Sequence, residues 1–328
     1  MNKHKVIIDC DPGIDDSLAL LYALKHPSLE IIALTIVAGN APVDIALDNA
    51  FKILEQTGRT DIPIYRGAEK PLERDFVSAQ DTHGIDGLGE SNIPRLSHQK
   101  AQDTSAQDFL AEYFSHPRQT SIIALGPLTN IALALERNPQ LGFNLKRFVS
   151  MGGSYKAHGN CSPVAEYNYW CDPHAARKVF KRLGKKIEMV GLDVTRSIVL
   201  TPNILEYIRF KNPTLGDFIG QITRFYWDFH WKYEGIIGCV INDPLAIAYF
   251  VNSQLCQGFQ SWVDIATDGI SLGQTLVDAY NFYHHTPNAL VLTKVDSMAF
   301  FGNFLSILLD LSEENVRKEL ERTKLISC

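Results

Sequence analysis

Four aspartates lie close together near the start of the chain, within the stretch "KVIIDCDPGIDD". They are Asp9, Asp11, Asp15 and Asp16. Carboxylates at this spacing repel one another, and partial burial strengthens the repulsion. Asp15 and Asp16 suit the first turn of a helix, whose dipole favours negative charge, but this explanation does not cover Asp9 and Asp11. Because hard divalent cations bind carboxylate and carbonyl oxygens, the stretch predicts a metal site.

Other residues able to bind a ligand follow later apolar segments. They are Asn40 in "VAGN", Asn160, Glu166 and Asn168 in "GNCSPVAEYN", and Asp243 in "NDPLAIAYF". His83 lies in the long polar segment 66–104, and a loop of this length in a compact domain is usually functional or mobile. Taken alone, each residue has an ordinary explanation as a turn, a helix cap or a solvent-facing side chain.

An alternation of strands and helices must position these residues. Strands are predicted at 5–10, 29–39, 62–67, 120–126, 147–153 and 187–193, with helices at 15–26, 43–58, 105–117, 127–139 and 172–184. Near-continuous apolar strands separated by helices predict an α/β fold: a mostly parallel, Rossmann-like open sheet with helices on both faces. Ligands then bind at the carboxyl ends of the strands. The sequence contains no linker or repeat, so we expect a single domain, 1–328.

The composition of the chain argues against several kinds of binding partner. The chain has 328 residues and a net charge of −6, and it contains no basic block, so we expect no nucleic-acid polymer as partner. Its six cysteines lack CxxC spacing, which argues against a thiolate zinc site. We find no signal-peptide pattern and no apolar run of about 18 residues, so we expect a cytoplasmic protein with no membrane partner.

Five motifs occur in one order along the chain: "DCDPGIDD", "GPLTNIA", "MGG", "GN-x5-E-x-N" and "DP-x-A-x-A". In this order they resemble the calcium-dependent nucleoside hydrolases of the inosine-uridine-preferring type, over nearly the whole chain. The resemblance implies a Ca²⁺ ion held by Asp11, Asp16, Asp243 and the backbone carbonyl of Leu125. Asp11 would also act as general base on a water that the cation activates, and Asp9 would support the site from behind.

The same resemblance implies a ribonucleoside substrate and a homodimer or homotetramer. Ribose would be hydrogen-bonded by Asp15, Asn40, Asn160, Glu166 and Asn168. Cleavage of the N-glycosidic bond builds positive charge on the sugar, which nearby carboxylates stabilise. The products would be ribose and a free purine or pyrimidine base.

The sequence departs from the best-known branch of this family at Asn242. That branch has a histidine there to help protonate the leaving base, and an asparagine cannot act as a general acid near neutral pH. Tyr226 and His230, one turn apart on a predicted helix, can face one pocket. We expect His83 and His230 to contact the base or donate the proton, with Tyr226 and Asn242 beside the substrate. The base preference stays open.

Trp227 and Trp231, on a neighbouring face of the same helix, are predicted to pack in the core.

Three other classes of protein compete with this interpretation. A catalytically silent nucleoside- or ribose-binding protein of the same fold would not need a carboxylate base. A Mg²⁺-dependent aspartate phosphohydrolase would have a hydroxyl or β-branched residue where Gly13 stands, and a later acidic pair with a lysine. A dinucleotide-binding oxidoreductase would have G-x-G-x-x-G after the first strand, and this chain does not.

Overall fold

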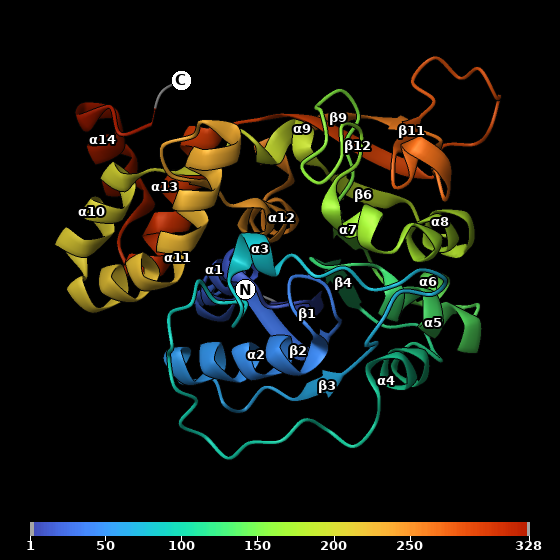
Figure 1. The fold of residues 1–328 in the computed structure, drawn as a ribbon, viewed down its shortest axis with the longest axis horizontal. Helices are drawn as coiled ribbons and strands as arrows, with labels where there is room; N and C mark the ends of the chain where they lie inside the picture. Colours follow the sequence, from blue (N-terminus) through green and yellow to red (C-terminus); the bar gives the residue numbers. More distant parts are fainter. Residues whose placement is uncertain (1–2, 327–328) are drawn as a thin grey trace.

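An eight-stranded sheet forms the centre of the protein in a computed structural model that describes residues 3–326 (Figure 1). The strands, in order across the sheet, are β3 (Ile64–Arg66), β2 (Leu29–Ile36), β1 (His4–Cys10), β4 (Thr120–Ala124), β5 (Phe148–Met151), β6 (Ile187–Val190), β12 (Ala289–Val295) and β9 (Cys256–Ser261). All neighbouring pairs are parallel except β12 and β9, which are antiparallel. The predicted α/β fold with a mostly parallel sheet is confirmed.

Helices cover both faces because the central strands are apolar on both sides. In β1, Val6 and Ile8 pack in one hydrophobic cluster and Ile7 in the other, since successive side chains of a strand point to opposite faces. The first cluster includes α1 (Ile14–Lys25), α2 (Val43–Thr57), α12 (Asn242–Val251) and α13 (Ser297–Leu309). The second includes α4 (Ala106–Tyr113), α5 (Thr129–Arg137) and α8 (Pro173–Arg182), on the right of Figure 1.

The remaining elements extend these layers. The helices are α3 (Gln80–His83), α6 (Leu141–Asn144), α7 (Tyr167–Cys171), α9 (Leu192–Thr195), α10 (Pro202–Lys211), α11 (Pro213–Glu234) and α14 (Glu313–Thr323), with 3-10 turns at Ser253–Leu255 and Gly269–Ser271. Two small antiparallel pairs complete the fold: β7 (Val199–Leu200) with β8 (Cys239–Val240), and β10 (Val263–Ile265) with β11 (Thr275–Val277).

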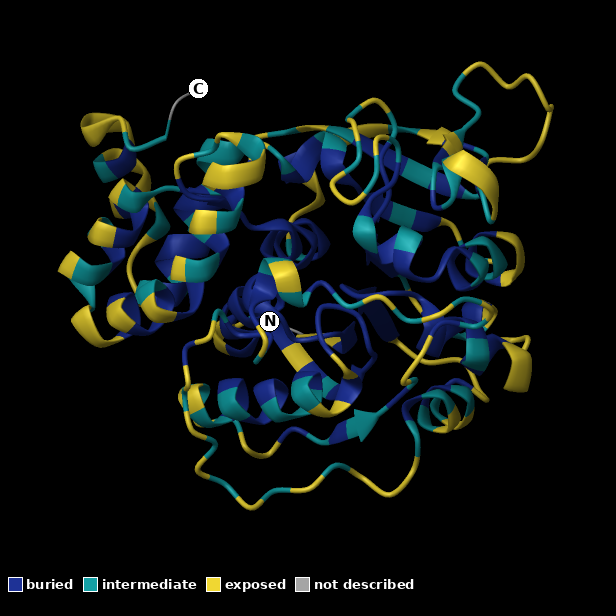
Figure 2. Cartoon of the chain, viewed as in Figure 1, coloured by how far each residue is buried: buried dark blue, intermediate teal, exposed yellow. Residues whose placement is uncertain are grey.

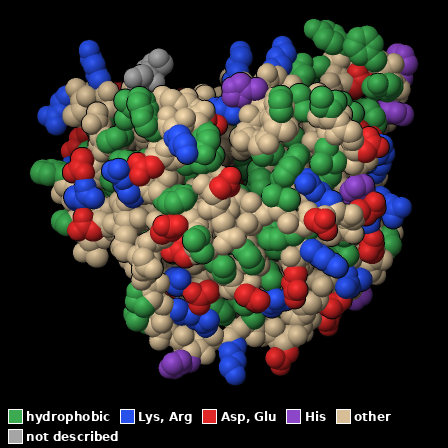
Figure 3. All heavy atoms as spheres, in the orientation of Figure 1, with side chains coloured by type: hydrophobic (Ala, Val, Ile, Leu, Met, Phe, Trp, Pro, Cys, Tyr) green, Lys and Arg blue, Asp and Glu red, His purple; other side chains and the backbone are tan. Residues whose placement is uncertain are grey.

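Burial follows this arrangement. Figure 2 shows the strands and the inward helix faces buried, with exposed residues on the outer faces of α10 and α14, whereas the outer face of α2 is mostly of intermediate burial. Acidic and basic side chains are interspersed over the face seen in Figure 3. None of the helices within residues 3–326 has both the length and the apolar character needed to cross a membrane.

The predicted elements agree with the structure except in a few places. Segment 66–104 holds the short helix α3, which the sequence did not indicate. The prediction that Trp231 packs in the core is wrong, because this residue is 62% exposed. Trp227, one turn earlier on α11, does pack against the core. The assignment of the chain to a single domain stays a prediction.

Candidate active site

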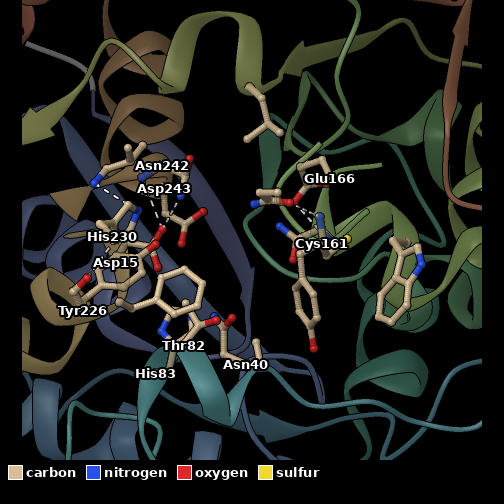
Figure 4. A pocket seen from close by; sticks show the side chains of 18 of the residues that line it. Asp15, Asn40, Thr82, His83, Cys161, Glu166, Tyr226, His230, Asn242 and Asp243 are labelled. Carbon is tan, nitrogen blue, oxygen red and sulfur yellow. Dashed lines mark hydrogen bonds between the residues drawn. The ribbon is translucent and has the colours of Figure 1, made fainter. Parts of the chain in front are cut away.

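A cavity of about 390 Å³ opens at the carboxyl ends of the central strands. Leu125 directly follows β4, Met151 ends β5, and Asn40 lies four residues beyond the end of β2. The predicted site residues that line the cavity are Asp15, Asn40, His83, Leu125, Asn160, Glu166, Asn168, Tyr226, His230, Asn242 and Asp243. Figure 4 shows Asp15, His83, Tyr226, His230 and Asp243 on one side, with Glu166 across the space. The fold therefore brings together residues that are far apart in the sequence.

Residues 9–16, which span the end of β1, the turn and the start of α1, are here named the acid loop. Asp16 closes it: its Oδ1 accepts the Asp11 N–H at 3.2 Å, and its Oδ2 accepts the Gly13 N–H at 3.1 Å. The side chain of Asn40 donates to Asp16 Oδ2 at 2.7 Å. These bonds hold the backbone of the loop around one carboxylate.

Asp11 is fully buried beside the cavity lining. Its Oδ2 accepts the Asn40 N–H at 2.7 Å, whereas its Oδ1 has no hydrogen-bond partner. Gly39 and Gly126 lie against the carboxylate, and a Cβ on either would overlap one of its oxygens. A buried, unpartnered carboxylate oxygen is costly unless a cation or a proton occupies it.

A cation fits the acidic cluster. Asp15, Asp16 and Asp243 each offer an oxygen within 4.8 Å of the others, and all three are buried. Burial, with repulsion from neighbouring carboxylates, raises the pKa of Asp16 to about 7 and that of Asp243 well above its usual range. Arg196, which also lines the cavity, pairs with Glu234 at 3.5 Å instead of neutralising the cluster. The donor set, all oxygen and highly acidic, is the kind that hard divalent cations prefer.

The set of three carboxylates differs from the expected ligands in one member, because it contains Asp15 in place of Asp11. Asp15 Oδ2 accepts both the backbone N–H and the side-chain amide of Asn242, at 3.2 and 3.0 Å. One oxygen of Asp15 is thus already hydrogen-bonded, while Asp11 Oδ1 is not. The assignment of Asp11 as a metal ligand stays a prediction.

Glu166 and Asn168 organise the opposite side of the cavity. Glu166 caps α7 and accepts three backbone N–H groups, from Gly153, Asn168 and Tyr169, at 2.7 to 3.2 Å. Burial raises the pKa of Glu166 to about 7, and the three hydrogen bonds oppose that rise. Asn168 Nδ2 donates to the Leu125 carbonyl at 2.6 Å. Of the predicted residues on this side, only Asn160 is exposed; its Oδ1 accepts the Tyr167 N–H.

His83 and His230 flank the Tyr226 ring, with centroids 5.1 and 4.3 Å from it. His83 Nδ1 accepts the Ile14 N–H at 3.1 Å, so the neutral ring carries its proton on Nε2. His230 Nδ1 lies 2.9 Å from the Tyr226 carbonyl, which can only accept, so its proton is on Nδ1 and Nε2 is an acceptor. Burial is the largest influence on both histidines and lowers their pKa values. In the neutral state His83 can donate through Nε2 and His230 cannot.

Several residues that shape or line the cavity were not predicted from the sequence. Asp193 accepts the N–H groups of Tyr155, Lys156 and Ala157 at 2.6, 2.7 and 3.0 Å, and so fixes the loop that leads to Asn160. The strand-end motif "GLDVT" was the available signal for it. Cys161, Arg196, Phe229 and Tyr233 also line the cavity.

Asp9, the first residue of the acid loop, does not line the cavity, and its predicted role in supporting the site stays a prediction. Its Oδ1 accepts from Thr35 at 2.6 Å and from Asn130 at 2.8 Å, and burial raises its pKa to about 7.

The sequence is similar to known enzymes over most of its length. Residues 6–302 match the family described as inosine-uridine preferring nucleoside hydrolase. The pyrimidine-specific ribonucleoside hydrolase RihA of Shewanella baltica is 38% identical over 92% of this chain and 94% of its own. The probable uridine nucleosidase 1 of Oryza sativa subsp. japonica is 35% identical over 85% of this chain and 86% of its own.

Comparison with solved structures points to the same family as comparison of the sequence. The plant nucleoside hydrolase PpNRh1 superposes with a TM-score of 0.87 at 33% identity, covering 93% of this chain and 99% of its own. The purine-preferring ribonucleoside hydrolase from Gardnerella vaginalis also gives 0.87, at 31% identity, covering 96% of this chain and 99% of its own. The chain therefore belongs to the inosine-uridine preferring nucleoside hydrolase family, and it is a hydrolase acting on N-glycosyl compounds.

Proposed function

We propose that this enzyme is a calcium-dependent hydrolase that converts a pyrimidine ribonucleoside and water to ribose and the free base. The observation that carries the proposal is the group of buried carboxylates at the edge of a cavity of about 390 Å³. A cavity of this size falls within the usual range for small-molecule sites. Its lining of carboxylates and amides suits the hydroxyls of a sugar.

Asp11, Asp16, Asp243 and the Leu125 carbonyl are the proposed ligands. When bound, the cation neutralises these carboxylates and makes water easier to deprotonate. Asp11 accepts the proton of the attacking water, and Oδ1, which has no hydrogen-bond partner, is the atom available for it. The water oxygen bonds to C1′ as the bond from C1′ to the base breaks, and the base leaves with the electron pair.

The substrate is held at both ends. Ribose hydroxyls bind to Asp15, Asn40, Asn160, Glu166 and Asn168, all of which line the cavity. Negative charge on Glu166 and Asp15 stabilises the positive charge that develops on the sugar. The base lies beside Tyr226 and His230, and the Nε2–H of His83 donates to it as it departs.

The pyrimidine preference is supported by the names of two relatives, the pyrimidine-specific RihA and the probable uridine nucleosidase. It is tested by incubating the enzyme with uridine, cytidine, inosine, guanosine and adenosine, with and without phosphate, and measuring free ribose and free base. The proposal predicts the highest kcat/KM for uridine or cytidine and equal turnover without phosphate. A higher kcat/KM for the purine nucleosides would contradict the preference, and binding without turnover would favour the catalytically silent alternative.

A further inference from the structure

Two loops of the proposed active site meet at the side chain of Asn49. One is the acid loop, residues 9–16. The other follows α3 and is here named the histidine loop, residues 83–92. Asn49 lies in α2 and is fully buried, and its Nδ2 donates to the Pro12 carbonyl at 3.1 Å and to the Asp86 carbonyl at 2.9 Å. One side chain thus links the two loops, although it does not line the cavity itself.

The chemistry of this link requires a primary amide. The amide nitrogen has two N–H groups, and each has one carbonyl acceptor. Asn49 Oδ1 in turn accepts from Lys52 Nζ at 3.3 Å, so the amide has a single favourable orientation. A carboxylate at this position would place an oxygen against two carbonyl oxygens, and an alanine would leave both carbonyls without a donor.

Hydrogen bonds within the histidine loop hold Asp86 and His83 at fixed positions relative to each other. The Asp86 carboxylate accepts the N–H groups of Leu88 and Glu90, both at 2.8 Å. The Gly89 N–H donates to the His83 carbonyl at 2.8 Å. Gly89 has a φ of +71°, and a Cβ there would overlap the Ile222 carbonyl of α11. The loop is therefore fixed both internally and against α11.

The acid loop also contacts the histidine loop directly, since the Ile14 N–H donates to His83 Nδ1 at 3.1 Å. That bond depends on the relative position of the two loops. It also places the His83 proton on Nε2, where the proposed function needs it.

We infer that Asn49 is a positioning residue for nucleoside hydrolysis. It holds the acid loop and the histidine loop in register, so that the carboxylates at the sugar and His83 at the base act on one bound substrate. This inference rests on the proposed function and assigns a role to a residue outside the cavity.

Asn49→Ala tests the inference, with Asn138→Ala as the matched control. Asn138 also donates through Nδ2 to two carbonyls, those of Ala111 at 2.9 Å and Phe114 at 3.0 Å, and it lies outside the cavity lining. Each variant is compared with the wild type by uridine kinetics, by thermal unfolding and by calorimetric titration with calcium chloride. His83→Ala, alone and combined with Asn49→Ala, completes the set.

Both alanine variants are expected to lose thermal stability, but only Asn49→Ala should affect the site. We expect kcat to fall at least tenfold and the calcium dissociation constant to rise at least fivefold, against changes below twofold in Asn138→Ala. In the His83→Ala background, Asn49→Ala should lower kcat by less than threefold, because the histidine that it positions is gone. An unchanged calcium affinity, or rate losses that multiply in the double variant, would show that Asn49 does not link the two loops and would overturn the inference.

Two provisions keep the test decisive. If Asn49→Ala does not fold, Asn49→Ser takes its place under the same criteria, because a single hydroxyl cannot donate to both carbonyls. If the wild type releases no ribose from uridine or any other nucleoside, the proposed function fails, whereas the calcium titration still tests whether Asn49 holds the acid loop.

Discussion

Asp15 and Asn242 lie 227 positions apart in the chain, and Asn242 donates two hydrogen bonds to a single oxygen of Asp15. One comes from its backbone N–H and one from its side-chain amide. Asn242 therefore fixes the orientation of a carboxylate proposed to bind ribose. Because an amide does not titrate, Asn242 keeps both of its donors whatever the pH.

Asn242→Ala should lower kcat/KM roughly tenfold, because it removes one hydrogen bond to a charged group, worth about 1.5 kcal/mol. Asn242→Asp should be much more damaging, since a new carboxylate would face Asp15. Steady-state kinetics with uridine check this order. Equal activity of the two variants would mean that the Asp15 contact does not matter for turnover.

Removal of one carboxylate from the acidic cluster should stabilise the protein when no cation is present. In EDTA, Asp243 is either ionised against its neighbours or protonated at a cost, and both penalties disappear in Asp243→Asn. We expect the variant to unfold ~2 °C or more above the wild type in EDTA. Calcium should raise the Tm of the wild type but not that of the variant.

Asp217→Asn, at an exposed residue of α11, is the control for this comparison, and its response to calcium should match that of the wild type. A variant that is less stable in EDTA, or that keeps the full calcium response, would argue against a cation site at Asp243.

The two histidines should differ in how they assist the leaving base. His83→Ala should lower kcat for uridine by ~10² or more, because it removes a positioned donor. His230→Ala should cost less, since neutral His230 presents an acceptor at Nε2. Neither change should matter as much for an aryl riboside whose leaving group needs no proton. A larger loss for His230→Ala on uridine would reverse the assignment.

Stability should also depend on pH through His83. Burial, with a smaller contribution from His230, lowers the pKa of His83 from its ordinary 6.5, while Asp15 and Asp81 partly oppose this. Below pH 6.5 the unfolded chain therefore binds a proton that the folded protein resists, and the free energy of unfolding falls as pH falls. Above pH 6.5 the contribution of His83 to the free energy of unfolding does not change with pH.

In urea titrations with excess calcium, His83→Asn should lose less stability than the wild type between pH 7 and pH 5. His116→Asn, at an exposed histidine, should behave like the wild type. The same pH dependence in all three proteins would exclude His83 as the source of the stability loss at low pH.

The alternation of elements and the acid loop were predictable from local pattern. The run Lys5–Cys10 is apolar enough to predict a buried strand, and the predicted helix 43–58 ends at Gly58, which caps α2 with a φ of +66°. The strand-end rule then placed Asn40 near Asp11 without any contact information, whereas Leu125 was implied only by the family resemblance.

Other parts depend on long-range contacts, which a local pattern does not contain. The four residues of α3 are too few to show helical periodicity, and His83 is buried because Tyr226 of α11 and the acid loop pack against it. Trp231 has the spacing of a packed aromatic residue, yet it lies on the solvent-facing side of α11, next to the buried His230. The link through Asn49 was not foreseen, because a buried asparagine within a helix has no sequence signature that names its partners.

The most direct test of the account measures ribose release from uridine as a function of calcium concentration, for the wild type and for Asp11→Asn. The wild type should be inactive after chelation and recover with added calcium to a saturating rate. Asp11→Asn, which keeps the shape of the side chain but cannot take up a proton, should remain at least ~10² slower at saturating calcium. Full activity of the wild type in EDTA, or near-normal turnover by Asp11→Asn, would contradict the proposed mechanism.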